Sequence, residues 1–279
     1  MNNENNPLNS YFRKPAIHMS LPSGGQFYLK GTLNMPETKE LPVYPMSALD
    51  EISYKTPDAL FNGSAAIEVI RSCVPAITDP WMIPQCDMTS ILTNIRIASF
   101  GHLLEVDTTC PKCKEISTYN IDLRHISDSM KMPDYGTGLE FGALNIFFKP
   151  LNYKQVNEGN KKSFEEQQLS KAIIDSDLDE NEKISKMTEA FNSISKYTIE
   201  SLADSILVIR TPDSDVTDRA YIIDYLKNCE RAVYQKIKDE IITQRRINDL
   251  KPLKITCDNK KCKHEYEQPF TLDMSSFFE

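Results

Sequence analysis

Two short cysteine stretches decide the fold, TCPKCK at residues 109–114 and TCDNKKCK at residues 256–263. Each is followed by a run in which apolar and polar residues alternate, at residues 119–123 after the first stretch and at residues 268–272 after the second. Such alternation is typical of a β-strand with one buried face. The sequence therefore predicts two similar halves, each a tight cysteine turn that leads into a strand.

Together these stretches supply the ligands expected of one zinc site: Cys110, Cys113, Cys257 and Cys262. Zinc prefers four soft ligands in a tetrahedron, and a gap of two to four residues lets one turn present two sulfurs to the same ion. Thiolates crowd together only when a metal neutralises them, so the ion stabilises the folded chain. A site with four thiolates has no open coordination position, and we therefore expect the zinc to be structural.

About 140 residues separate the two cysteine pairs, whereas zinc-site patterns usually leave a much shorter gap. This spacing predicts a zinc ribbon whose halves are split by a large insertion. Two alternatives stay open. One is disulfide bonding, which fits poorly because there is no signal-peptide pattern and three further cysteines, Cys73, Cys86 and Cys229, have no evident partners. The other is two separate sites completed by histidines: His102 or His125 near the first pair, and His264 near the second.

The composition of the chain, with 279 residues, 40% hydrophobic and 26% charged, is that of a globular protein with a substantial core. No apolar run approaches the ~20 residues that span a bilayer, so we expect no membrane contact and a cytosolic protein. A net charge of −8 argues against general nucleic-acid binding. Lysines do surround the cysteines, and they are either solvated or bind phosphate: Lys112, Lys114, Lys254, Lys260, Lys261 and Lys263.

Local patterns predict an α+β protein of mixed small sheets and helices, with the split four-cysteine zinc ribbon carrying a large helical insertion. The expected regions are an extended N-terminal arm with edge strands at 1–60, helices and the first half of the ribbon at 61–130, an inserted and mainly helical region at 131–250, and the second half of the ribbon with a C-terminal tail at 251–279. No catalytic motif is present, so we predict no catalytic residue, no bound organic cofactor and no enzymatic activity.

Several elements are expected individually. Strands are expected at Phe27 and Tyr28 after a Ser-Gly-Gly turn, at residues 41–46 as a proline-containing edge, and at residues 102–106 and 144–150. Helices are expected to start at Ser47 and Thr56 and to cover residues 65–71, 87–98, 153–196 with a break near 175–179, a segment from a Thr217 cap to 226, and 230–247. Within residues 87–98, one apolar face is formed by Met88, Ile91, Leu92 and Ile95.

Beyond these patterns, several stretches occur along the chain in an order that suggests a family. They are LPS at residues 21–23, PMSALDE at 45–51, TP at 56–57, NG at 62–63, IRIASFG at 95–101, CPKC at 110–113 with IDL at 121–123, and the second cysteine pair before a Phe277-Phe278 end. In this order they resemble the baseplate protein family of T-even-type contractile-tailed phages. The resemblance covers residues 15–125 and 197–279.

The resemblance implies a non-enzymatic structural component of the baseplate hub, or a factor that assists hub assembly. Its partners would be other phage baseplate or tail hub proteins, in the virion tail or in the host cytoplasm during assembly. The four cysteines carry over as the zinc-site candidates. Independently of the resemblance, the edge strands expected near Tyr28 and Tyr44 are candidates for completion by a strand of a partner. The alternative function is a zinc-ribbon nucleic-acid-binding regulator, which the lysines near the cysteines favour and the net acidity disfavours.

Overall fold

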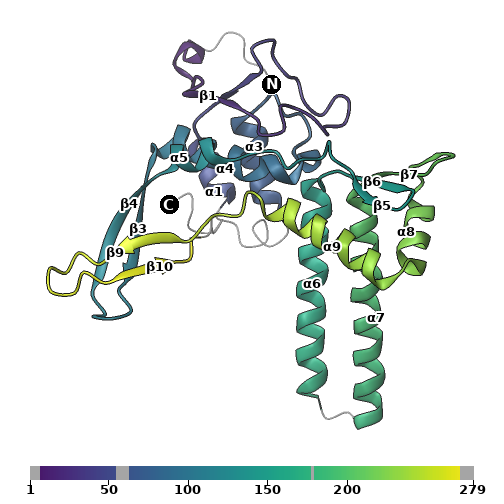
Figure 1. Ribbon diagram of the computed structural model, residues 1–279. Coiled ribbons are helices and arrows are strands. Elements are labelled where there is room, and N and C mark those ends of the chain that lie inside the picture. Colours follow the sequence, from purple (N-terminus) through teal and green to yellow (C-terminus); the bar gives the residue numbers. More distant parts are fainter. Residues whose placement is uncertain (1–6, 55–62, 177–178, 271–279) are drawn as a thin grey trace. The chain divides into compact units, whose positions relative to one another are not determined.

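The computed structural model describes residues 7–54, 63–176 and 179–270 (Figure 1). Helices and several small antiparallel sheets make the protein α+β, as predicted. The expected helix start at Thr56, the first six residues of the arm and the C-terminal Phe277-Phe278 lie outside the described residues. Within the described residues, none of the helices has an apolar stretch long enough to cross a membrane.

The chain forms two compact units, and both consist of segments that are separate in sequence. The first contains Met1–Pro80, Asp87–Lys131 and Asn248–Glu279, and the second contains Trp81–Cys86 and Met132–Ile247. Two elements run across the boundaries between these segments: the 3-10 helix η2 (Pro80–Met82) and the helix α4 (Gln85–Phe100).

The first unit also holds these elements: η1 (Asn9–Tyr11), β1 (Ile17–Ser20), β2 (Glu40–Val43), α1 (Ala48–Tyr54), α3 (Ser64–Cys73), β3 (Leu103–Thr109), β4 (Ile116–Asp122), α5 (Leu123–Ser129), β9 (Leu253–Thr256) and β10 (Glu265–Gln268). Three two-stranded antiparallel sheets join β1 to β2, β3 to β4 and β9 to β10.

Helix α4 is the central element of the first unit. Its predicted apolar face is buried, with Ile91 and Ile95 fully inaccessible to solvent, and the helix ends at Gly101, whose φ of 87° favours glycine. Polar residues of α4 are buried as well. Asp87, with no exposed surface, accepts hydrogen bonds from the backbone N–H of Ser23 at 2.8 Å and from its hydroxyl at 2.6 Å. These two bonds fix the turn at residues 22–27 onto the helix.

The turn at residues 22–27 corrects one sequence prediction. The expected strand at Phe27 and Tyr28 does not form. Gly24, Gly25 and Phe27 all adopt positive φ, which curls the chain and prevents an extended conformation there. The strand lies before the turn instead, because β1 pairs with β2 along the register from Ile17–Val43 to Ser20–Glu40. The proline-containing edge strand was predicted correctly and is β2, which carries Pro42.

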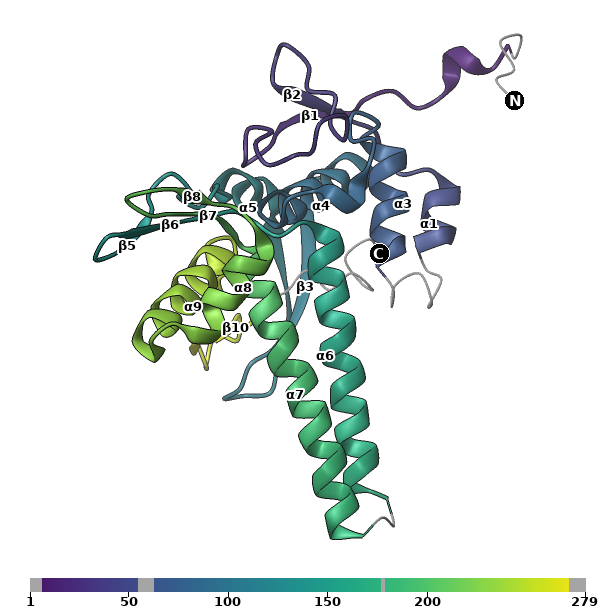
Figure 2. The same ribbon diagram turned by 90° about the vertical axis from the view of Figure 1, so that its right-hand side faces the viewer.

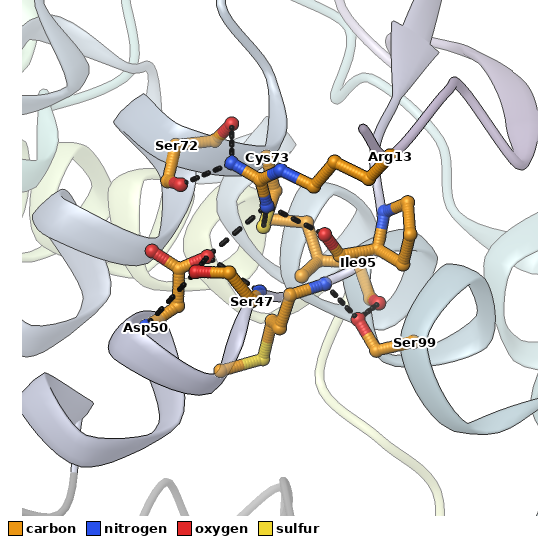
Figure 3. Close-up of polar contacts among 9 residues, drawn as sticks. Arg13, Ser47, Asp50, Ser72, Cys73, Ile95 and Ser99 are labelled. Carbon is orange, nitrogen blue, oxygen red and sulfur yellow. Dashed lines mark hydrogen bonds and ion pairs between the residues drawn. The ribbon is translucent and has the colours of Figure 1, made fainter. Parts of the chain in front are cut away.

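Arg13 anchors the end of the N-terminal segment to the helices of the first unit (Figure 3). Its guanidinium donates to the carbonyl of Pro45 at 2.6 Å, to the carboxylate of Asp50 at 3.1 Å and to the carbonyl and hydroxyl of Ser72. Burial opposes ionisation of Asp50, but hydrogen bonds from Ser47 and Ser72 and the charge of Arg13 lower its pKa. Asp50 also completes the predicted start of α1, since it accepts from the backbone N–H of Ser47.

The second unit combines a sheet with helices. Its strands are β5 (Leu139–Phe141), β6 (Leu144–Phe148), β7 (Ile206–Arg210) and β8 (Asp215–Val216), and its helices are α6 (Tyr153–Ile174), α7 (Glu180–Asp204), α8 (Arg219–Asn228) and α9 (Arg231–Arg246). The strands form one antiparallel sheet in the order β5-β6-β7-β8. Its core includes Ile146, Phe148, Ile206, Ile222, Ile237 and Ile241. The cap of α8 is Asp218 and not the predicted Thr217, because the Asp218 carboxylate accepts from the N–H groups of Ala220 and Tyr221.

Helices α6 and α7 form a long antiparallel hairpin (Figures 1 and 2), as the break near residues 175–179 predicted. A reciprocal capping box between Asn152 and Gln155 starts α6, and the carboxylate of Asp179 caps α7. The two helices come close at Gly159 of α6, which faces the ring of Tyr197 on α7. Any larger residue at position 159 would overlap the Tyr197 hydroxyl oxygen.

We therefore expect Gly159→Ala to destabilise the hairpin. Alanine normally stabilises a helix interior by about 0.5–1 kcal/mol relative to glycine. Here the added methyl group must displace Tyr197, and overpacking of this kind costs about 1–3 kcal/mol. Urea unfolding followed by circular dichroism measures the difference. In the control variant, Gly159→Ala is combined with Tyr197→Phe, which removes the overlapping oxygen and should recover much of the loss. A Gly159→Ala protein more stable than the parent would contradict the close approach.

Candidate metal centre

The two cysteine turns occupy equivalent positions in their hairpins. Strand β3 ends immediately before Cys110 and β4 begins three residues after Cys113. Strand β9 ends immediately before Cys257 and β10 likewise begins three residues after Cys262. The predicted pair of similar halves is therefore present, although the second strand starts at Glu265, earlier than the alternation at residues 268–272 indicated.

The backbone of both turns follows the same pattern. The N–H of Cys110 donates to the carbonyl of Glu115 at 2.9 Å, and the N–H of Cys257 donates to the carbonyl of His264 at the same distance. In each turn the residue after the second cysteine is a lysine with positive φ, 63° at Lys114 and 42° at Lys263. A left-handed residue at this point turns the chain back toward its partner strand and leaves both sulfurs on one side.

The hairpins β3–β4 and β9–β10 lie side by side (Figure 1), and side chains join them. The Tyr119 hydroxyl of β4 donates to the carbonyl of Thr256 at 2.9 Å, and the hydroxyls of Thr108 and Tyr266 are 2.7 Å apart. Asn259, between the second pair of cysteines, donates its amide to the carboxylate of Glu115 in the first turn. These bonds hold the two cysteine turns face to face.

As a result, the four cysteine sulfurs converge. All four lie within 4.8 Å of one another, with 3.5 Å between those of Cys113 and Cys257 and 3.9 Å between those of Cys110 and Cys262. A zinc–sulfur distance of about 2.3 Å puts the sulfurs of a tetrahedral site about 3.8 Å apart. A disulfide requires about 2.05 Å, and all four cysteines are free. The spacing therefore suits a metal held by four sulfurs.

The local electrostatics of these thiols differ. Burial opposes ionisation of Cys110, but the backbone N–H groups of Lys112 and Cys113 donate to its sulfur and lower its pKa to about 7. Burial raises the pKa of Cys257 to about 12, and hydrogen bonds of its thiol with the neighbouring cysteine sulfurs raise it further, although the N–H of Asn259 acts in the opposite direction. A bound divalent cation would favour the thiolate form of all four residues.

The two alternatives to a single four-cysteine site, disulfide bonds and separate sites completed by histidines, find less support in this geometry. Across the described residues, the four cysteines are the single group of three or more potential ligands close enough to hold a metal, and no histidine joins it. His264 contributes its backbone carbonyl to the second turn, while its ring stacks on Tyr266 with centroids 6.3 Å apart. Cys73, Cys86 and Cys229 form no disulfide and do not belong to the group.

Sequence reasoning missed the residues that join the hairpins. Thr108, Tyr119, Asn259 and Tyr266 bear no motif, and their roles depend on which strands meet. One signal was available: Thr108 shares a strand face with the apolar residues Leu104 and Val106, and Tyr266 stands between two glutamates, which predicts a covered face in each strand.

Comparison with known proteins supplies a family. A family model described as T4 bacteriophage base plate protein matches residues 16–279, which include both cysteine pairs, the whole second unit and the first unit from residue 16 onward. The chain belongs to this family. The match confirms the resemblance found in the sequence and extends it through the inserted region, including α6 and α7. No curated protein and no solved structure matches the chain significantly.

Proposed function

We propose that this protein is a non-enzymatic structural protein of the phage tail baseplate, either a component of the hub or a factor that assists hub assembly. Membership of the base plate family over residues 16–279 is the observation that carries the proposal. Its partners are other baseplate or tail hub proteins. Its place is the virion tail, or the host cytoplasm while the tail is built.

The metal that fits the cysteine site is zinc, held by Cys110, Cys113, Cys257 and Cys262. Four sulfurs within 4.8 Å of one another favour zinc over ions that prefer oxygen ligands, such as magnesium or calcium. Such an ion supplies no catalysis, since its coordination sphere is filled. It ties the hairpin β3–β4 to the hairpin β9–β10 and so fixes the surface that these hairpins present to a partner.

The N-terminal segment is a candidate for partner contacts. Leu8, Tyr11 and Phe12 expose 60%, 83% and 57% of their surfaces, and Arg13 fixes the chain directly after them. Residues 17–43 are different, because Leu41 and Val43 belong to the core. A truncation that tests the contacts should therefore end at residue 12.

Inactivating the gene in its phage is the experiment that tests this function. We expect the yield of infectious particles to fall by at least an order of magnitude, with incomplete baseplates visible by electron microscopy. Wild-type protein supplied in trans should restore the particles. A variant that lacks residues 2–12 should remain folded and restore them poorly. Mass spectrometry of purified virions then separates a hub component, which is present, from an assembly factor, which is absent.

Normal tails in the absence of the protein would overturn the proposal. In that case the nucleic-acid alternative has its own test, the binding of the purified protein to DNA and RNA as salt is raised. A regulator that uses the lysines around the cysteines would bind tightly at low salt and lose affinity steeply as salt increases.

A further inference from the structure

Helix α7 carries an exposed apolar stripe made of Ile184, Met187, Phe191 and Ile194. Their side chains expose 63%, 45%, 71% and 43% of their surfaces, although all four are large and apolar. They are spaced three, four and three residues apart, the repeat by which one helix packs along another in a coiled coil. On a helix whose surface is otherwise polar, an exposed apolar stripe with this repeat indicates that another helix packs over it.

Helix α6 does not cover the stripe. It packs against a neighbouring flank of α7, where Ala190 is buried and Tyr197 meets Gly159. Successive residues of an α-helix are rotated by about 100°, so the stripe fills a sector of about 80° next to that flank. Four charged residues of this part of α7 lie on the opposite side of the helix, Glu182, Lys186, Glu189 and Lys196, whereas Lys183 lies between the stripe and the α6 flank and Glu180 lies one turn before Ile184. Helix α6 thus covers one half of the apolar surface of α7, and the other half, the stripe, is open to solvent.

The open border of the stripe is uncharged. The residues next to it, away from α6, are Asn181, Thr188, Asn192 and Ser195. Two identical surfaces of a chain with net charge −8 generally repel each other. The open border brings no like charges together, and the acidic residue in line with the stripe, Glu180, lies at its end, at the first position of α7. This neutrality suits a contact between two copies of the same surface.

We propose that two copies of this protein associate through the α7 stripes of their α6–α7 hairpins. Two hairpins packed in this way form a four-helix bundle, in which the a and d positions Ile184, Met187, Phe191 and Ile194 make the core. A twofold axis pairs the same patch on both copies and closes the assembly at a dimer.

The area available agrees with a dimer. Large side chains offer on the order of 150–250 Å² when fully exposed, so the stripe supplies on the order of 400 Å² per copy at its observed exposure. Two copies would bury about 800 Å² from the stripes alone, and stable interfaces bury about 1,200–2,000 Å² in total. The uncharged border residues of both copies supply the remainder as a polar rim.

Sedimentation equilibrium of the full-length, metal-loaded protein tests the proposal, with reducing agent present so that no disulfide links the copies. The expected mass is that of a dimer. Phe191→Glu should raise the dimer dissociation constant at least 100-fold, since it places a carboxylate from each copy in the apolar core. The control, Lys196→Glu, adds the same charged side chain on the opposite side of α7 and should leave the dimer intact.

Circular dichroism shows whether each variant keeps its helices. If Phe191→Glu loses them, Ile184→Glu, nearer the tip of the hairpin, repeats the test. A wild-type protein that stays monomeric up to about 100 μM would overturn the proposal, as would a dimer that persists in both stripe variants. A monomeric wild type would mean that a different protein, and not a second copy, covers the stripe. The test uses purified protein alone, so its result is independent of the proposed baseplate function.

Discussion

Replacing Cys110 and Cys257 with serine is expected to abolish metal binding and to unfold the paired hairpins. The substitution removes one sulfur from each turn, and two sulfurs do not make a structural zinc site. Binding of structural zinc is worth about 10–16 kcal/mol in small zinc domains, so its loss is larger than the effect of an ordinary point mutation. Elemental analysis should find one zinc per chain in the wild type and none in the variant, and thermal unfolding should begin at a much lower temperature.

Cys229→Ser is the matched control for the cysteine variant. Cys229 is half-buried and free, and it does not belong to the cysteine group, so this protein should keep its metal and its unfolding temperature. Chelation of the wild type should reproduce the double variant, and acidification should also release the ion because protons compete for the thiolates. Two zinc ions per chain would instead indicate separate sites completed by histidines, and a chain without metal would refute the centre altogether.

Asp87→Ala is expected to cost about 2–4 kcal/mol of unfolding free energy. Asp87 has no exposed surface, and its carboxylate accepts from both the N–H and the hydroxyl of Ser23, itself only 1% exposed. Alanine would leave at least these two buried donors without their acceptor, and each unsatisfied group costs about 1–3 kcal/mol. Urea unfolding of the full chain measures the change.

A double-mutant cycle shows whether the loss at Asp87 runs through Ser23. Ser23→Ala removes the hydroxyl bond to Asp87 and the bond that the hydroxyl accepts from the N–H of Gly25 at 3.1 Å, but it leaves the bond from the Ser23 N–H to Asp87, and it should destabilise the protein less than Asp87→Ala does. The double variant should then be clearly less destabilised than the sum of the two single changes, because both remove the same interaction. Strict additivity would mean that the 2.6 Å bond contributes nothing measurable.

Local sequence patterns were sufficient for elements whose structure depends on near neighbours. The α6–α7 hairpin was predicted from helical periodicity and an acidic break, and the apolar face of α4 from its spacing. Sequence patterns failed where contacts between residues far apart in the sequence determine the local structure. Phe27 looks like a strand residue, but its positive φ belongs to a turn that α4 holds in place through Asp87. Asp87 itself looks like a solvated helix residue until its partner, 64 positions earlier, is known.

The candidate site was predictable to a similar degree. The cysteine spacings identified four candidate ligands because close pairs of sulfurs have few other uses in a chain of this kind. The residues that bring the turns together, such as Tyr119 and Asn259, could not be recognised, since their partners lie 137 and 144 residues away. Nothing in the spacing shows which strand edges meet.

The separation of the two cysteine turns also has a consequence for synthesis of the chain. Cys113 leaves the ribosome about 140 residues before Cys257, an interval on the order of ten seconds at ordinary translation rates. During this interval the first pair has no second pair with which to share an ion, while α6, α7 and the sheet of the second unit are being made. A metal held by all four cysteines, as proposed above, would therefore be bound only after the insertion has been translated. A chain cut short within the insertion would lack the second pair, so metal content would report whether synthesis went past the insertion.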